Sequence, residues 1–184
     1  EGIDLWGECY SIENTTALGW LPFIPDSVTS FPEELFSLVN LISLSINYTN
    51  ISGVIPPQIG NLSNLIRLDL SSNQFSGIIP PEIGSLTNLT SLDLSSNQFS
   101  GNIPAELFDL INLKGEVENM TGPGGGASVF YQGLNLSNNL LTGSISAEIG
   151  DLIHLKSLDL SFNQLEGDLP IELYSLDSLQ SLNL

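Results

Sequence analysis

The chain has 184 residues, of which 41% are apolar, and its 21 acidic and 3 basic side chains give a formal net charge of −18 at pH 7. This balance argues against DNA, RNA or an anionic membrane as the main partner, because each requires a basic surface. The length allows one domain with a substantial core, and no apolar run approaches the roughly 18 residues of a membrane helix. The single cysteine, Cys9, cannot form a disulfide within the chain.

The first 17 residues lack the periodicity of the rest of the chain and contain Trp6, Cys9 and Tyr10. We predict that residues 1–17 form an N-terminal cap that covers the apolar core behind it. The alternative is a ligand site built from exposed aromatic side chains. The chain opens with EGID, without a methionine or a signal-peptide core, so we expect a mature or excerpted segment.

A short leucine motif recurs along the rest of the chain. Successive motifs start 24, 24, 42, 24 and 24 residues apart, and an earlier unit from Leu18 to the first of them is 26 residues long. A fixed period is the signature of a repeat architecture, so residues 18–184 are predicted to be repeats of about 24 residues. The leucines that open the motif are Leu44, Leu68, Leu92, Leu134, Leu158 and Leu182.

Each repeat begins with L-x-L, an alternation that is typical of a short strand with one buried face. Leu68 and Leu70 are expected to point inward, whereas Arg67, Asp69 and Ser71 should face solvent. An asparagine follows where the chain leaves the strand, and its amide can satisfy backbone groups of the turn and form a ladder between stacked repeats. The ladder should consist of Asn73, Asn97, Asn139 and Asn163, with Thr49 as a weaker member.

The second half of each repeat is predicted to close the coil. Phe75, Phe99, Leu141 and Leu165 can stack as an apolar spine, and the glycine that follows each of them permits a tight turn. Apolar residues at spacing three, such as Ile83, Leu86 and Leu89, indicate a short 3-10 or helical segment. One repeat buries too little surface to fold alone, so its stability must come from stacking on its neighbours.

The stretches FSGIIP, FSGNIP and, more loosely, LEGDLP resemble the plant-type subclass of the leucine-rich repeat family. This resemblance implies a right-handed α/β-class solenoid with a concave parallel sheet and short 3-10 or helical convex segments. It also implies extracellular or cell-surface display. The stretch LWGECYSIENTT resembles the N-terminal flank of bacterial leucine-rich repeat proteins. Plant-type caps usually carry paired cysteines, and this chain departs from that pattern with one.

Two features interrupt the repeat. An insertion at about 114–133, KGEVENMTGPGGGASVFYQG, is predicted to be a flexible glycine-rich loop. The alternative is an island that folds over the concave face and contacts ligand through Val129, Phe130 and Tyr131. The chain stops at SLNL inside a strand, so we expect either a missing C-terminal cap or end-to-end stacking on another molecule.

The concave positions supply the candidate binding residues. Asp69 and Asp93 should lie about 4.8 Å apart on neighbouring strands, close enough to reach one cation. Flanking serines are poor ligands, however, so we predict no metal site and no cofactor. Phe162 is interpreted as the one large aromatic at its position. The predicted binding residues are Arg67, Asp69, Asp93, Asn135, Asp159 and Phe162.

The chain contains seven Asn-x-Ser/Thr sequences, which would carry glycans only in a eukaryotic secretory route. A glycan on Asn135, which is expected to project from a concave strand, would block part of the binding face. The candidates are Asn14, Asn47, Asn50, Asn61, Asn88, Asn119 and Asn135.

Catalysis is not predicted. The only histidine, His154, falls on an outer variable position, and no serine, cysteine or carboxylate is placed by motif to form a triad with it. We predict an extracellular recognition module that binds a protein, peptide or glycan through the concave sheet. One alternative is an adhesin or fibre subunit that assembles end to end; another, inhibition of a wall-degrading enzyme, rests on the family resemblance.

Overall fold

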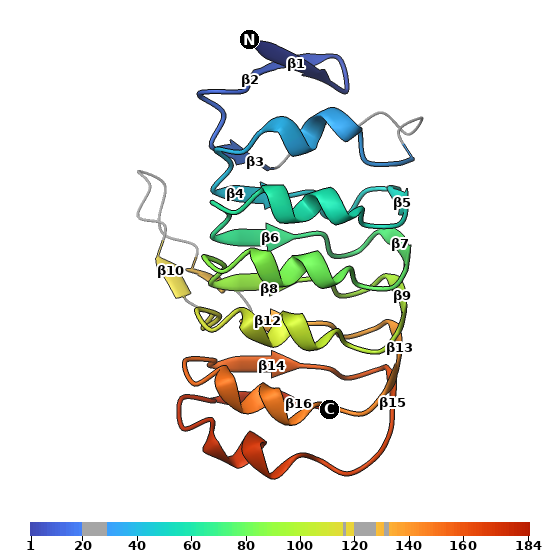
Figure 1. Cartoon of the computed structure of the whole chain (residues 1–184), viewed down its shortest axis with the longest axis vertical. Coiled ribbons are helices and arrows are strands. Elements are labelled where there is room, and N and C mark those ends of the chain that lie inside the picture. The colour runs from blue at the N-terminus through green and yellow to red at the C-terminus, as the bar shows by residue number, and fades with distance from the viewer. Residues whose placement is uncertain (20–28, 116, 120–127, 131–132) are drawn as a thin grey trace.

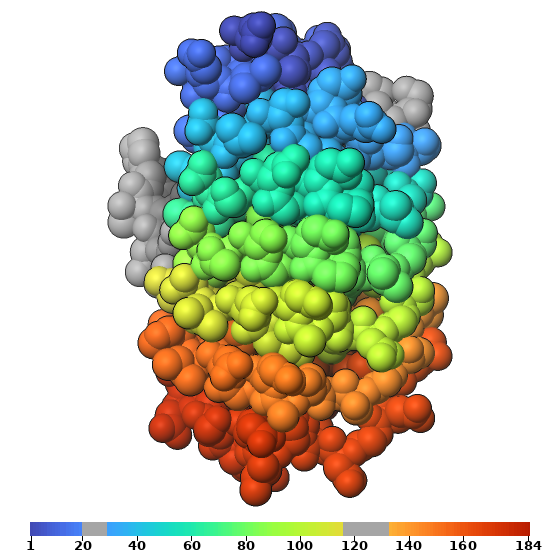
Figure 2. Space-filling model, in the orientation of Figure 1, coloured from blue at the N-terminus to red at the C-terminus, as the bar shows by residue number. Residues whose placement is uncertain are grey.

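The computed structural model describes residues 1–19, 29–115, 117–119, 128–130 and 133–184. It shows a stack of similar coils that runs from the N-terminus to the C-terminus (Figure 1). The space-filling view shows these coils as successive layers in chain order (Figure 2). Each layer therefore packs mainly on the layers before and after it, as expected for a repeat protein.

One strand from each coil joins a seven-stranded parallel sheet, in the order β16-β14-β12-β8-β6-β4-β3. The motif leucines lie directly opposite one another, so Leu68 pairs with Leu44 on one side and with Leu92 on the other. Leu92 in turn pairs with Leu134, so the insertion leaves the register unchanged. The strands are β3 (Ala17–Leu18), β4 (Ser43–Ser45), β6 (Arg67–Asp69), β8 (Ser91–Asp93), β12 (Leu134–Asn135), β14 (Ser157–Asp159) and β16 (Ser181–Asn183).

A second parallel sheet, which the sequence analysis did not predict, follows the asparagine of each coil. The glycines assigned to tight turns close its longer strands, and Gly77 and Gly101 have φ values of 77° and 76°. Glycine adopts this left-handed conformation without the steric cost of a side chain. The strands are β5 (Ser52–Gly53), β7 (Gln74–Gly77), β9 (Gln98–Gly101), β13 (Leu140–Gly143) and β15 (Gln164–Leu165).

The predicted 3-10 segments are confirmed on the side of each coil away from the seven-stranded sheet. Each has five residues and begins after an extended residue, which is proline in most coils. The helices are η1 (Glu33–Ser37), η2 (Pro57–Asn61), η3 (Pro81–Ser85), η4 (Ala105–Asp109), η5 (Ala147–Asp151) and η6 (Ile171–Ser175).

The fourth residue of each 3-10 helix decides how closely the next helix approaches. A Cβ atom added at Gly84 would collide with the carbonyl oxygen of Glu106 in η4, so η3 and η4 pack this tightly only because this position is glycine. Phe108 stands at the same position of η4, and its ring is 2% exposed. A cleft of about 550 Å³ lies between η4 and η5, lined in part by Phe108 and Ile153.

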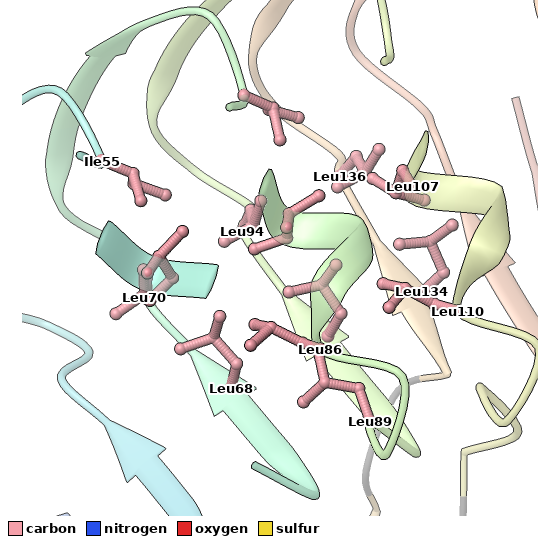
Figure 3. Close-up of a cluster of buried hydrophobic side chains, with 14 of the residues drawn as sticks. Ile55, Leu68, Leu70, Leu86, Leu89, Leu94, Leu107, Leu110, Leu134 and Leu136 are labelled. Atoms are coloured by element: carbon pink, nitrogen blue, oxygen red, sulfur yellow. The ribbon is translucent and has the colours of Figure 1, made fainter. Parts of the chain in front are cut away.

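The core is a continuous column of leucine and isoleucine side chains between the sheet and the 3-10 helices. Leu68 and Leu70 point inward as predicted, at 1% and 0% exposure, and Leu86 and Leu89 meet them from the helical side (Figure 3). The aromatic spine is also present, since the rings of Phe75 and Phe99 stack with centroids 6.1 Å apart.

The predicted asparagine ladder is confirmed, and each of its asparagines connects its own coil to the coil before it. The Asn97 Nδ2 donates to the carbonyl oxygens of Leu70, Leu94 and Ser95 at 3.0, 3.2 and 3.1 Å. Its Oδ1 accepts the Phe75 N–H at 3.0 Å. Because these backbone groups are buried, the amide supplies partners that water cannot.

A second, unpredicted asparagine ladder stabilises the corner at the end of the 3-10 segment in four successive coils. The Nδ2 of Asn64 donates to the carbonyl oxygen of Val39 in the preceding coil at 2.9 Å. Asn40, Asn88 and Asn112 make the equivalent bond in their coils. Its signal is an Asn-Leu pair whose leucine lies three residues before the L-x-L motif, except at Asn112-Leu113, where the insertion separates the pair from the motif.

Two antiparallel hairpins lie outside the repeats. The first joins β1 (Gly2–Leu5) to β2 (Glu8–Ser11), and its Leu5 is 1% exposed within the core. The second joins β10 (Val117–Asn119) to β11 (Ser128–Phe130), so two segments of the insertion pair with each other. The glycine cluster at 122–126 of the predicted loop falls outside the described residues, and the loop stays a prediction. Among the residues that the structure describes, no helix is both long enough and apolar enough to span a bilayer.

Candidate binding face

The outward side of the seven-stranded sheet, here called the sheet face, carries the candidate binding residues. Its central column contains the middle residue of each L-x-L motif, and these residues face one another in register across the strands. We call this the acidic column: Ser45, Asp69, Asp93, Asn135, Asp159 and Asn183.

Hydrogen bonds fix the carboxylates of the acidic column. The Asp69 Oδ1 accepts the backbone N–H of Ser71 at 3.0 Å and its hydroxyl at 2.7 Å, while Oδ2 accepts the Asn47 amide at 2.7 Å. Ser71 is therefore only 8% exposed, and the prediction that it faces solvent was wrong. Asp159 repeats the arrangement with its own serine and the amide of Asn183.

Asp93 sits in the same arrangement but next to a second carboxylate. Its Oδ1 accepts the Ser95 N–H at 2.9 Å and its Oδ2 accepts the Asn135 amide at 3.3 Å. Burial raises the pKa of Asp93 above its ordinary value of 3.8, and the charge of neighbouring Asp69 raises it further, against the lowering effect of these hydrogen bonds. Ionisation of Asp93 is therefore less favourable in the folded protein than in the unfolded chain.

We expect Asp93→Asn to raise the melting temperature at pH 7 by about 1–3 °C. Asparagine at position 135 already accepts both hydrogen bonds of its serine, so an amide can replace the carboxylate. The replacement gives up only the long 3.3 Å bond from the Asn135 amide, which the new Nδ2 cannot accept. As pH rises above 3.8, the unfolded chain loses the Asp93 proton before the folded protein does, which lowers the free energy of unfolding of the wild type. Below that value both states are protonated, so the pH-dependent part of the gain should vanish.

Thermal unfolding of both proteins at pH 7 and pH 3 measures this difference. Asp109→Asn, on the exposed end of η4, is the matched control for the loss of one negative charge. An advantage of Asp93→Asn that is equally large at pH 3, or a loss of stability at pH 7, would contradict the assignment.

Asn135 lies differently from its prediction. Its side chain is 9% exposed, and its Oδ1 accepts the N–H and hydroxyl of Ser137 at 3.1 and 2.8 Å. The expectation that Asn135 projects from its strand was therefore wrong. Asn47 is half-buried, while Asn14, Asn50, Asn61 and Asn88 are exposed and remain predicted glycan acceptors; the side chain of Asn119 lies outside the described part.

Beside the acidic column runs a second line of side chains, here called the rim column. Its five residues, one per coil, share a left-handed backbone with φ of 54° or 55°. The N–H groups of the first four donate to the backbone of the next coil, as Ser96 does to the Ser137 carbonyl at 2.9 Å. The rim column consists of Tyr48, Ser72, Ser96, Asn138 and Phe162.

Two members of the rim column are large and exposed. Phe162 is 78% exposed and Tyr48 is 83% exposed, with shorter polar side chains between them. The interpretation of Phe162 as the one large aromatic of its column was therefore wrong. Tyr48 follows Leu44 at the same interval as Phe162 follows Leu158, so the register contained the signal.

Of the remaining predicted binding residues, only Arg67 has a described side chain on the sheet face. Arg67 is half-buried in β6 on the sheet face. The side chains of Val129 and Phe130, and the whole of Tyr131, fall outside the described residues. Within the described ranges, no three His, Cys, Asp or Glu side chains are grouped so as to hold a metal ion.

The fold and this face define the class of protein: a parallel-sheet solenoid that presents one polar sheet face with two exposed aromatic side chains. Leucine-rich repeat family models match residues 39–99, 132–152 and 154–176. The chain belongs to the leucine-rich repeat family, in its plant-type form. No curated protein sequence gave a significant match.

Several solved structures are similar to the chain. The ectodomain of the Arabidopsis thaliana receptor kinase GASSHO1/SCHENGEN3, in complex with CASPARIAN STRIP INTEGRITY FACTOR 2, is 37% identical over 84% of this chain and 16% of that chain, with a TM-score of 0.72. The Arabidopsis HAESA ectodomain with an IDA peptide hormone is 39% identical over 85% and 23%, with a TM-score of 0.68. The BIR3–SERK2 complex from Arabidopsis thaliana is 32% identical over 78% and 69%, with a TM-score of 0.60.

The chain thus spans less than a quarter of the GASSHO1 and HAESA chains that it matches. Those two ectodomains were solved in complex with CASPARIAN STRIP INTEGRITY FACTOR 2 and with a peptide hormone, whereas BIR3 and SERK2 form a complex with each other.

Proposed function

We propose that this chain is an extracellular, non-catalytic recognition module that binds a peptide or an extended protein segment on the sheet face. The observation that carries the proposal is the rim column, where Tyr48 and Phe162 are 83% and 78% exposed on an otherwise short, polar surface. Exposed aromatic side chains are the residues most often responsible for binding energy at protein interfaces.

The rigidity of the sheet face supports this proposal. The carboxylates of Asp69 and Asp159 are held by hydrogen bonds from their serines and from the amides of other coils. Side chains that are ordered before binding lose little conformational entropy when a ligand arrives. The similarity to the HAESA ectodomain solved with a peptide hormone favours a ligand of the same class.

Selection of a phage-displayed random dodecapeptide library on the intact chain tests this function. We expect enriched peptides to lose binding to Ser96→Arg, because a long side chain in the middle of the rim column obstructs the sheet face. Gln58→Arg adds the same charge on exposed η2, away from that face, and should keep binding. The proposal fails if no peptide is enriched, or if Ser96→Arg binds the enriched peptides as well as Gln58→Arg does.

A further inference from the structure

The two exposed aromatic side chains of the rim column are separated by a fixed number of coils. The chain passes from Tyr48 to Phe162 through Ser72, Ser96 and Asn138, one residue per coil, and each step is tied by a backbone hydrogen bond to the next coil. Neighbouring strands are about 4.8 Å apart, so four steps place the two rings about 19 Å apart along the stack.

The surface between the two rings is low and polar. Ser72 is half-buried, and Ser96 and Asn138 are exposed, but all three side chains are much shorter than the aromatic ones. An extended peptide advances about 3.3 Å per residue, so about six residues span the distance between the rings. A peptide laid along the rim column would therefore meet an apolar contact at each end and hydroxyl and amide groups in between.

The negative charge beside the rim column favours basic side chains in the middle of such a peptide. Asp69, Asp93 and Asp159 lie in the adjacent acidic column, each half-exposed. The whole chain has 21 acidic and only 3 basic residues. A negative potential of this kind attracts basic ligands and disfavours acidic ones.

We infer that the ligand of the sheet face is an extended cationic segment with two apolar side chains about six residues apart, one on Tyr48 and the other on Phe162. This inference rests on the proposed function and specifies its ligand class. It gives Tyr48, which was not among the predicted binding residues, the same importance as Phe162.

Three synthetic nonapeptides, each with serine at the remaining positions, test the inference by fluorescence anisotropy on the intact chain. The first has leucine at positions 2 and 8 and lysine at 4 and 6; the second replaces both lysines by glutamate. The third exchanges leucines and lysines, so that its composition and charge are those of the first but its leucines are only two positions apart. We expect the first to bind at least tenfold more tightly than the second and at least fivefold more tightly than the third.

The variants Tyr48→Ser and Phe162→Ser locate the two contacts. Serine is suitable because Ser72 and Ser96 already hold the same left-handed backbone, and the replaced side chains are exposed, so the melting temperature should not change. Each substitution should weaken binding of the first peptide at least fivefold. If only one of the two variants binds the first peptide more weakly, the arrangement with two contacts is wrong.

The outcomes separate this inference from the proposed function. Equal binding of the first and third peptides, or preference for the acidic one, overturns the inference. If none of the three binds while library peptides bind in a manner sensitive to Ser96→Arg, the function stands and the inference is wrong. If no library peptide binds either, both are wrong.

Discussion

Replacing Leu92 with aspartate should unfold several neighbouring coils rather than one strand. Leu92 is fully buried and lies between Leu68 and Leu134 in the sheet. A carboxylate there would be surrounded by aliphatic side chains with no cation to pair, at a cost of more than about 4 kcal/mol. Because each coil is stable only when stacked, the loss of one removes support from the coils on both sides.

Hydrogen exchange followed by mass spectrometry measures how far this unfolding spreads. We expect protection to fall in peptides from β6 and β12 as well as β8. Ser96→Asp is the matched control, because it introduces the same charge at an exposed position of the same coil. Protection that falls only in β8 would show that the coils are not coupled as the packing indicates.

Asn97→Ala should be nearly as harmful, although it removes no apolar contact. The side chain is 9% exposed, its Nδ2 donates three hydrogen bonds, and its Oδ1 accepts the Phe75 N–H. Alanine leaves the Phe75 N–H and the Leu70 carbonyl buried without this partner, and each such loss costs about 1–3 kcal/mol. We expect the free energy of unfolding to fall by about 3–5 kcal/mol.

Urea denaturation monitored by circular dichroism gives this free energy. Gln98→Ala provides the comparison, because Gln98 is the adjacent residue and is exposed. If the two variants lose similar amounts of stability, the ladder contributes little beyond the backbone bonds of the sheets. A loss confined to Asn97→Ala would assign the ladder a main role in holding successive coils together.

The repeat could be predicted from the sequence because each position recurs in the same role. Leu68 and Leu92 identify a strand, Asn73 and Asn97 a ladder, and Ile83 the inward side of a 3-10 helix, all of which the structure confirms. In such a chain, one correctly assigned coil predicts the others. The repeat architecture followed from that periodicity, and the family from the resemblance of stretches such as FSGIIP, which the family models and solved structures confirm.

Features that depend on contacts between coils were harder to predict. Ser71 alternates with Leu70 as an outward residue should, yet the Asp69 carboxylate draws its hydroxyl into a hydrogen bond and buries it. Tyr48 was predictable from the register, because it precedes Thr49 of the ladder as Phe162 precedes Asn163, but the rim column was not extended to that coil. The five-stranded sheet was missed because its strands contain no L-x-L alternation.

The insertion has no periodic counterpart, so the sequence offered no neighbouring coil from which to infer its structure. Composition favoured a loop but did not indicate that Val117–Asn119 and Ser128–Phe130 pair with each other. Glycine content alone did not reveal the pairing, because strand pairing across a loop depends on the two segments that flank the glycines rather than on the glycines themselves.

The fourth residue of each 3-10 helix has a consequence for curvature. Hydrogen bonds hold neighbouring strands about 4.8 Å apart, whereas the opposite side of the stack is narrow at Gly84 and wide at Phe108. A wedge of this kind should tilt the two coils that it separates more than the close contact at Gly84 does. Phe108 belongs to the coil of Ser96, so this wedge lies between the third and fourth of the five coils that carry the rim column, inside the span from Tyr48 to Phe162.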